Sequence, residues 1–298
     1  MFKIVLILGP FTRNWLESPP MGPTDYRLKF WGVRGTVATP EPDKLRYGGN
    51  TACAAIQVAD DEFLILDCGT GARVLGSAIA KQRAGRPTRY HVFLSHYHFD
   101  HVEGLSLFQP LYDPASTITF HGFASDGRSI RKNLETLIAP PYFPVSLAGV
   151  PATVQFKDVD GSVFNVADLV VESIPLSHPD GSVAYRVTHG DKRLIFATDH
   201  EHGIEAVDRA LVDFCRNADY LIYDATYMQA EYETLRKGWG HSTWYAAVHV
   251  ARAATVKTLV LFHHHPEHTD TQLDEMERIA RLELPTALVA REGMELAF

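Results

Sequence analysis

The chain has 298 residues, of which 46% are hydrophobic, so it is long enough to bury a sizeable core. Its formal net charge is −8, from 28 basic and 36 acidic residues, and it contains no run of lysines or arginines. A protein that binds a long nucleic acid through its phosphates is usually basic, so this balance disfavours such a partner and favours a small anionic substrate. Three cysteines without a Cys-x-x-Cys pair favour a reducing compartment, and we interpret them as small buried residues.

The first segment of the chain is apolar but short. Residues 2–8 are stopped by Gly9-Pro10, are too few to span a bilayer and lack a typical signal cleavage site. We therefore expect a cytoplasmic protein with no membrane partner. Residues 1–24 are predicted to be an N-terminal extension, with Met21 as an alternative start, and residues 25–298 to form a single domain.

Strand-like and helix-like stretches then alternate along the chain. Residues 54–59 and 62–67 flank the polar pair Asp60-Asp61 and predict a β-hairpin. Gly69-Thr70-Gly71 predicts a tight turn into a helix over 72–82, because no Lys-Ser or Lys-Thr follows that would complete a phosphate-binding loop. Further strands are expected at 90–94, 169–176, 193–199 and 258–263, and further helices at 203–217, 242–254 and 271–282.

The segment 95–101, Ser-His-Tyr-His-Phe-Asp-His, places three imidazoles and a carboxylate directly after a strand-like run. Imidazole and carboxylate together suit Zn²⁺, Mn²⁺ or Fe²⁺. His96 and His98 lie two residues apart, so at the end of a strand their side chains leave the same face and can share one ion. Asp100 and His101 follow where the chain turns and can reach a second ion. The alternative interpretation is a polar loop that is merely rich in histidine.

This His-x-His-x-Asp-His pattern resembles the signature of the metallo-β-lactamase superfamily, and the resemblance extends from about Leu28 onward. His178, Asp199 and His263 follow or end strand-like runs, where the superfamily places a third histidine, a bridging carboxylate and a last histidine. The resemblance implies an α/β fold, a four-layer αββα sandwich of two mixed sheets flanked by helices. It also implies that one ion is held by His96, His98 and His178, a second by Asp100, His101 and His263, and that Asp199 lies between them.

The last ligand has close histidine neighbours. His263, His264 and His265 are all candidates, and we predict His263 from the register of the preceding strand. His264, His265 and His268 are interpreted as parts of a solvated loop.

Two later segments bear on the reaction. Leu221–Tyr227, which contains Asp224, and Gly240-His241-Ser242-Thr243 resemble the paired motifs of the ribonuclease Z-like phosphodiesterases, in which an acid orients a histidine. A protonated imidazole beside the metals can stabilise phosphate charge or protonate the leaving oxygen, and a carboxylate behind it raises its pKa. We predict these roles for His241 and Asp224. The alternative is a helix start with Ser242 as N-cap and His241 exposed.

Other positions narrow the superfamily resemblance. Asp199 stands where lactam-cleaving relatives commonly have cysteine, which disfavours lactam hydrolysis. The oxygen-reducing di-iron relatives commonly have glutamate in place of His98 and carry a fused flavodoxin domain, for which this chain is too short, so that class is disfavoured as well. The chain also lacks a Gly- and Pro-rich arm like that of transfer-RNA-processing relatives, which argues against a transfer-RNA precursor as substrate.

Three residues are candidates for substrate binding. Phe30–Gly35 and Arg46–Thr51 resemble motifs of the cyclic-nucleotide phosphodiesterase-like and phosphonate-pathway branches. Arg34 is either a phosphate contact or part of a structural ion pair. Asn50 ends a glycine-rich loop that is expected to approach the site. Tyr142 belongs to the proline-braced segment 139–145, which forms either a wall for a planar group or a rigid flap.

Together these features predict a hydrolase with two divalent ions. Zn²⁺ is the expected metal, and Mn²⁺ and Fe²⁺ are the alternatives. We expect a phosphodiesterase for a small diester such as a cyclic nucleotide, which acts through a metal-bridging hydroxide that Asp100 orients or deprotonates. A thioesterase or lactonase resembling glyoxalase II is the alternative enzyme, and a metal-retaining binding protein without turnover is the alternative of another class. The family resemblance makes a homodimer a candidate assembly.

Overall fold

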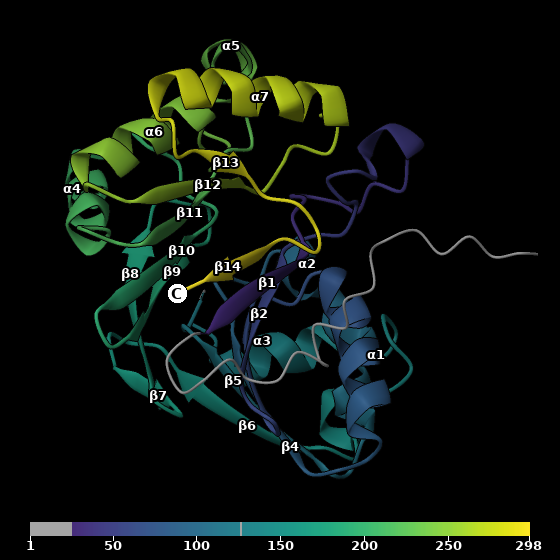
Figure 1. Cartoon of the computed structure of the whole chain (residues 1–298). Coiled ribbons are helices and arrows are strands. Elements are labelled where there is room, and N and C mark those ends of the chain that lie inside the picture. Colours follow the sequence, from purple (N-terminus) through teal and green to yellow (C-terminus); the bar gives the residue numbers. More distant parts are fainter. Residues whose placement is uncertain (1–25, 126) are drawn as a thin grey trace, which may run out of the picture.

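Apolar runs of the chain form the strands of two mixed β-sheets, which pack face to face in the computed structural model (Figure 1). The structure describes residues 26–125 and 127–298. In spatial order the first sheet contains β14 (Glu295–Ala297), β1 (Arg27–Gly32), β2 (Cys53–Ala59), β3 (Glu62–Leu66), β4 (Thr88–Phe93), β5 (Ser116–Gly122) and β6 (Thr153–Asp158). The second contains β13 (Leu288–Val289), β12 (Thr258–Phe262), β11 (Tyr220–Asp224), β10 (Lys192–Ala197), β9 (Ser182–His189), β8 (Leu169–Leu176) and β7 (Phe164–Val166).

Helices cover the outer face of each sheet. The α-helices are α1 (Gly71–Arg83), α2 (Phe99–Val102), α3 (Ile130–Leu137), α4 (Glu205–Phe214), α5 (Gln229–Glu231), α6 (Trp244–Ala253) and α7 (Asp270–Glu283). Short 3₁₀ turns are η1 (Pro42–Lys44), η2 (Glu103–Leu107), η3 (Gln109–Tyr112) and η4 (Leu147–Gly149), and η5 (Tyr232–Arg236) is a single π-helical turn. Helices α1 and α3 contact the first sheet, and α4, α6 and α7 contact the second.

Three apolar cores hold these layers together. The central core lies between the sheets and includes Phe30, Phe93, Phe196 and Phe262, none of which is exposed. A second core lies between the first sheet and α1 with α3, and a third between the second sheet and α4, α6 and α7. The predicted four-layer αββα sandwich is therefore confirmed.

Most predicted elements are present. The hairpin is formed by β2 and β3, which pair antiparallel from Ala54 opposite Leu66 to Ala59 opposite Glu62, and the glycine turn leads directly into α1. All three cysteines are free and buried, as predicted. The extension predicted over residues 1–24 lies outside the described residues. Within residues 26–125 and 127–298, no helix is long and apolar enough to cross a membrane.

Helix α6 does not begin with Ser242 as its N-cap, which is the alternative interpretation of this segment. The N-cap of α6 is Thr243, whose side chain accepts a hydrogen bond from Ala246 N, and not Ser242. The Ser242 hydroxyl is buried and donates instead to the carbonyl of His200 at 2.6 Å. Ser242 thus ties α6 to the loop after β10, while the next residue caps the helix.

Candidate metal centre

The carboxyl ends of five strands carry the predicted site residues. Strands β3 and β4 are parallel, as are β10, β11 and β12, and β8 runs in the direction of β10 because each is antiparallel to β9. The loops that leave parallel strands emerge at one edge of a sheet, and the facing edges of the two sheets meet here. The site residues that come after β4, β8, β10 and β12, and Asp224 at the end of β11, are therefore brought together.

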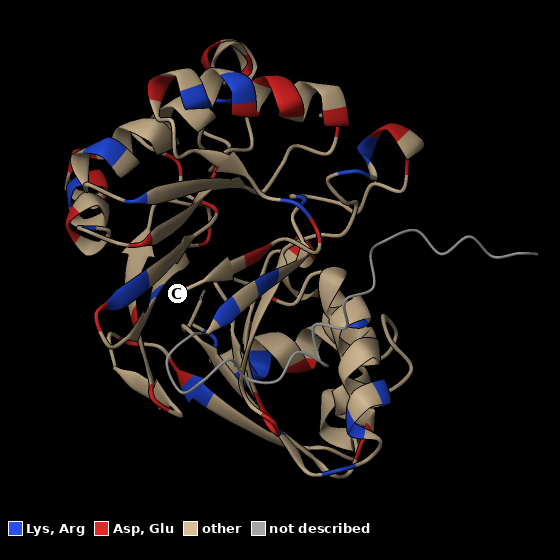
Figure 2. Ribbon diagram, viewed as in Figure 1, with Lys and Arg blue, Asp and Glu red and all other residues tan. Residues whose placement is uncertain are grey.

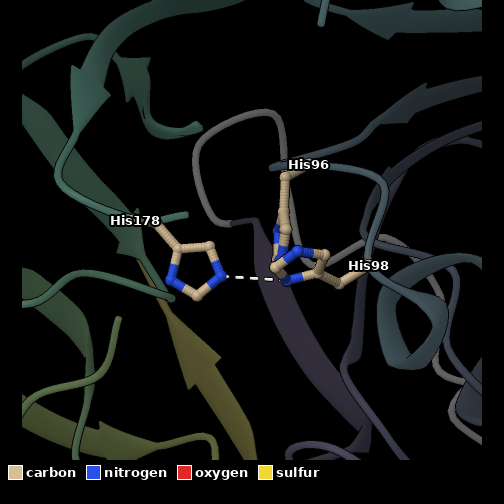
Figure 3. Close-up of side chains that lie close together, drawn as sticks. All are labelled: His96, His98 and His178. Atoms are coloured by element: carbon tan, nitrogen blue, oxygen red, sulfur yellow. Dashed lines mark hydrogen bonds between the residues drawn. The ribbon is translucent and has the colours of Figure 1, made fainter. Parts of the chain in front are cut away.

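Three histidines form one half of the cluster. His96 and His98 come after β4, and His178 comes after β8 and faces them from the other sheet (Figure 3). His178 Nε2 lies 3.0 Å from His98 Nδ1. Nε2 of His96 is buried and has no hydrogen-bond partner among the described residues. A buried nitrogen without a partner is costly, and a bound cation would satisfy it.

Asp100, His101 and His263 form the other half. His263 Nε2 lies 3.1 Å from Asp100 Oδ2 and 3.1 Å from His101 Nε2. Their Nδ1 atoms are occupied elsewhere, which leaves both Nε2 atoms directed at the same space. The side chains of His101 and His263 are fully buried.

Asp199 lies between the two halves. One carboxylate oxygen, Oδ1, is 3.6 Å from His96 Nε2 and 3.7 Å from His178 Nε2. The other oxygen, Oδ2, is 3.2 Å from His101 Nε2 and 3.3 Å from His263 Nε2. Each oxygen thus faces one half of the cluster, which is the arrangement expected of a carboxylate that bridges two ions.

A second set of side chains holds the histidines in place. Asp67, at the end of β3, accepts a hydrogen bond from His101 Nδ1 at 2.8 Å, as well as bonds from the backbone and hydroxyl of Ser95. Thr226 Oγ1 lies 3.0 Å from His263 Nδ1. Such partners select the tautomer that leaves Nε2 free for a metal.

His178 is oriented by a carbonyl. Its Nδ1 donates to Gly240 O at 2.6 Å. Gly240 has a φ of +87°, and a Cβ there would lie 2.4 Å from His178 Nδ1, so only glycine fits this close approach. Sequence patterns place Asp67 only at the end of a predicted strand, and they do not reveal Thr226 or this role of Gly240. The feature that could have indicated these three residues is their position at a strand end or next to a predicted site residue.

The backbone at three of these strand ends is left-handed. Asp67, Asp199 and His263 have φ values of 59°, 55° and 62°. Aspartate and histidine tolerate this region better than most residues, but it still carries strain that tends to collect at functional sites. The turn at each position directs the side chain across the edge of the sheet.

His241 and Asp224 meet beside this cluster. His241 Nδ1 lies 2.8 Å from Asp224 Oδ2, and the imidazole stacks on His263 with 4.9 Å between ring centroids. Asp224 is fully buried, and its Oδ1 accepts hydrogen bonds from the backbone and hydroxyl of Thr226. Burial by itself would lower the pKa of His241, but Asp224, with Asp199 and Asp100, raises it to about 9. The side chain of His241 is only 13% exposed, so the exposed position considered as an alternative is wrong.

The electrostatics of the cluster favour a bound cation. Burial opposes charge on His101, yet Asp199, Asp100 and Asp67 together raise its pKa well above the usual value. Burial lowers the pKa of His96 well below its usual value. The carboxylates that raise the pKa of His101 would equally stabilise a bound cation, which requires both imidazoles to be neutral. Nitrogen-rich and carboxylate ligands in two adjoining groups fit divalent ions of the zinc type.

The neighbours of His263 are placed differently from the prediction. His264 and His268 are buried, so the interpretation of a solvated loop is wrong for both. His264 Nε2 donates to Ala290 O at 2.7 Å, and His268 Nε2 lies 3.0 Å from a Glu231 oxygen. His265 is partly buried beside Tyr227. Among the three candidates for the last ligand, His263 is the one that faces Asp100 and Asp199.

Arg34 occupies a structural position whose burial disfavours the predicted phosphate contact, which stays a prediction. The residue is fully buried, and its guanidinium donates to four backbone carbonyls rather than to a carboxylate partner. These acceptors are Lys44 O, Gly48 O, His265 O and His268 O, at distances of 2.7 to 3.3 Å. Arg34 therefore joins the loop before β2 to the loop after β12.

The other two substrate-binding candidates lie in different settings. The side-chain amide nitrogen of Asn50, Nδ2, is 3.1 and 3.2 Å from the two carboxylate oxygens of Glu292. Asn50 therefore helps to hold the glycine-rich loop in place. Tyr142 is 82% exposed. Substrate contacts by these two residues stay predictions.

Fold and site together define a metal-dependent hydrolase architecture, and comparison with known proteins identifies the family. Residues 63–264 match the model of the β-lactamase superfamily domain, so the chain belongs to this superfamily. Ribonuclease Z from Haloarcula marismortui is 25% identical over 90% of this chain and 96% of its own length. The chain is therefore a metal-dependent hydrolase of the metallo-β-lactamase superfamily, and its sequence is similar to that of ribonuclease Z.

Solved structures share the fold. The metallo-β-lactamase fold protein YhfI from Bacillus subtilis has a TM-score of 0.69 at 18% identity, and the match covers 92% of this chain and 100% of that one. The short form of human tRNase Z has a TM-score of 0.61 at 19% identity, over 91% of this chain and 98% of that one.

Proposed function

We propose that this protein hydrolyses a small phosphodiester, such as a cyclic nucleotide, at a dinuclear metal centre. The observation that carries the proposal is the pair formed by His241 and Asp224 beside the clustered ligands. Since Nδ1 of His241 is held by the carboxylate, Nε2 is the atom available to a substrate. Ribonuclease Z relatives, which are named for cleavage of RNA, support the choice of a phosphodiester.

The two groups of ligands would each hold one divalent ion. In this proposal His96, His98 and His178 bind the first, Asp100, His101 and His263 bind the second, and Asp199 bridges them. Zn²⁺ suits the imidazole-rich first group best. Bound ions would neutralise charge on the phosphate and lower the pKa of a coordinated water to near neutrality.

In this proposal, side chains of the protein accept and donate the protons that hydrolysis transfers. Asp100, whose Oδ2 accepts a hydrogen bond from Thr36 N at 2.6 Å, is held in place to orient the attacking water or take its proton. His241 donates a proton from Nε2 to the leaving oxygen as the phosphorus–oxygen bond breaks. Asp224 keeps the imidazole in the required orientation and stabilises its charged form.

This arrangement favours an oxygen leaving group over sulfur. An expelled alkoxide is strongly basic and needs a proton in the transition state, whereas a thiolate, with a thiol pKa of about 8.5, leaves without one. A thioesterase would have little use for the His241–Asp224 pair. A lactone also expels an alkoxide, so lactone hydrolysis must be tested directly.

Surface charge supports a small substrate. Along α7, Asp and Glu outnumber the two arginines, and over the rest of the view in Figure 2 Lys and Arg are scattered among Asp and Glu. With a net charge of −8, the chain is a poor match for a long phosphate backbone.

The test is turnover by protein of measured metal content, loaded separately with Zn²⁺ and Mn²⁺. The substrates are bis(p-nitrophenyl) phosphate, a cyclic nucleotide, a thioester and a lactone. We expect metal-dependent hydrolysis of the diesters. His241→Ala should lower kcat for the cyclic nucleotide by about 10² to 10⁴-fold with metal content unchanged, because it removes a proton donor and no ligand. The effect on bis(p-nitrophenyl) phosphate should be smaller, because nitrophenolate is a weak base that leaves with little need of a proton. His249→Ala, on the exposed face of α6, is the matched control.

Three results would contradict the proposal. Turnover of the thioester or lactone with inert diesters would assign the alternative activity. Loss of metal in His241→Ala would make that residue a ligand. Cleavage of a precursor RNA but of no small diester would overturn the substrate class.

A further inference from the structure

A large aromatic side chain lies exposed next to the candidate proton donor. Trp239 is 57% exposed and stands two residues before His241. We propose that Trp239 forms a subsite that stacks on the nucleobase of a nucleoside phosphate whose phosphate lies at the metal centre, and that Arg236 beside it attracts this phosphate. This inference rests on the proposed phosphodiesterase function and names its substrate class.

The turn that carries Trp239 is held firmly although its side chain is exposed. Glu201 accepts hydrogen bonds from Gly238 N at 2.5 Å and from Gly240 N at 2.7 Å, and the hydroxyl of Tyr232 donates to it at 3.0 Å. Both amide neighbours of Trp239 are thus fixed by one carboxylate. An exposed tryptophan on a braced turn is arranged in advance for a flat partner, which lowers the cost of binding.

The same turn is tied to the metal cluster. The carbonyl of Gly240 accepts the hydrogen bond that orients the candidate ligand His178. Trp239 is therefore the immediate neighbour of a residue whose backbone positions the metal site. A ligand with its phosphate at the cluster would meet Trp239 at the rim.

A cation and a second aromatic ring connect Trp239 with His241. The guanidinium of Arg236 lies 4.5 Å from the centroid of the Trp239 ring and 6.0 Å from that of Tyr227. The Tyr227 ring is in turn 6.0 Å from the ring of His241. The row Trp239, Arg236, Tyr227 and His241 thus presents a stacking face, then a positive charge, then the candidate proton donor.

This order matches the chemistry of a nucleoside phosphate. Any of the nucleobases gains stacking energy on an indole face, and arginine attracts an anionic phosphate. Tyr142, the wall suggested by the sequence, is more exposed, and its backbone N–H bonds to Ala139 in its own segment. The contacts that reach His178 and His241 favour Trp239.

The experiment is calorimetric binding of adenosine monophosphate and of ribose 5-phosphate to the metal-loaded protein. Both ligands present a phosphate, and only the first carries a base. We expect adenosine monophosphate to bind more tightly to the wild type. Trp239→Ala should weaken it about 10-fold, leave ribose 5-phosphate unchanged and retain full metal content. Trp239→Phe should retain most of the preference, and Arg236→Gln should weaken both ligands.

Tyr245→Ala, which removes an exposed aromatic side chain of α6, is the control, and both affinities should stay at the wild-type value. Unchanged adenosine monophosphate binding in Trp239→Ala, or an equal loss for both ligands, would overturn the subsite, as would loss of the base preference in Tyr142→Ala, which would assign the stacking wall to Tyr142. Because binding is read without turnover, an enzyme that hydrolyses no diester but shows the Trp239-dependent preference would refute the proposed function and keep the nucleotide subsite.

Discussion

Replacing Asp67 with asparagine tests the hydrogen bond that holds His101. Asp67 is fully buried and accepts three hydrogen bonds, from Ser95 N at 2.7 Å, Ser95 Oγ at 2.8 Å and His101 Nδ1 at 2.8 Å. Asparagine keeps the shape and tolerates the left-handed backbone, and its remaining oxygen can still accept from Ser95 N. Its amide NH₂ would then face His101 Nδ1, which also bears a proton.

The magnitude of the effect depends on that one lost acceptor. The Ser95 hydroxyl can rotate and accept from the new amide, but His101 must lose its bond or change tautomer. A buried donor left unpaired costs about 1 to 3 kcal/mol. Loss of a partner behind a metal-binding histidine typically weakens metal binding about 10 to 100-fold. We therefore expect Asp67→Asn to bind its second ion about 10 to 100-fold more weakly.

The assay is zinc binding in competition with a chromophoric chelator, together with urea unfolding of the metal-free protein. Asp219→Asn is the matched control, because Asp219 is also buried and also accepts from a backbone N–H, that of Arg193, but outside the cluster. Two ions bound by Asp67→Asn with wild-type affinity would refute the reasoning. A loss of stability equal in both variants, without a change in zinc affinity, would make Asp67 merely structural.

Three further outcomes are expected. Arg34→Met should lower the free energy of unfolding by at least about 3 kcal/mol in urea titrations, because four carbonyls lose their donor; a loss below about 1 kcal/mol would contradict this. Burial beside His91 lowers the pKa of His121 to about 3. The unfolded chain then takes up a proton first, so stability should fall as the pH drops below about 6.5, by about 2 kcal/mol at pH 5, and His121→Phe should remove that part of the pH dependence. Gly240→Ala should reduce zinc content by displacing His178, and unchanged stoichiometry would show that the turn adapts.

The order of the apolar runs, and the residues that end them, determine much of the fold and of the candidate metal centre. A strand delivers its next residues to one edge of a sheet, so histidines and aspartates after β4, β8, β10 and β12 could be predicted to converge without knowledge of any contact. The hairpin of β2 with β3 and the turn into α1 are local, so adjacent residues suffice to predict them. Asp224 and His241 could be found because their motifs resemble those of a known family.

Only the tertiary structure decided which side chains meet when many are chemically alike. His263 and His264 are neighbours with the same side chain, yet the left-handed turn at His263 directs it to the cluster while His264 binds Ala290 O. Arg34 resembles a phosphate contact in isolation, but packing of two distant loops surrounds it with carbonyls. Asp67 likewise takes its role from His101, which is far away in the chain. Local patterns carry no record of such pairings, because burial and hydrogen-bond geometry arise only when the sheets pack together.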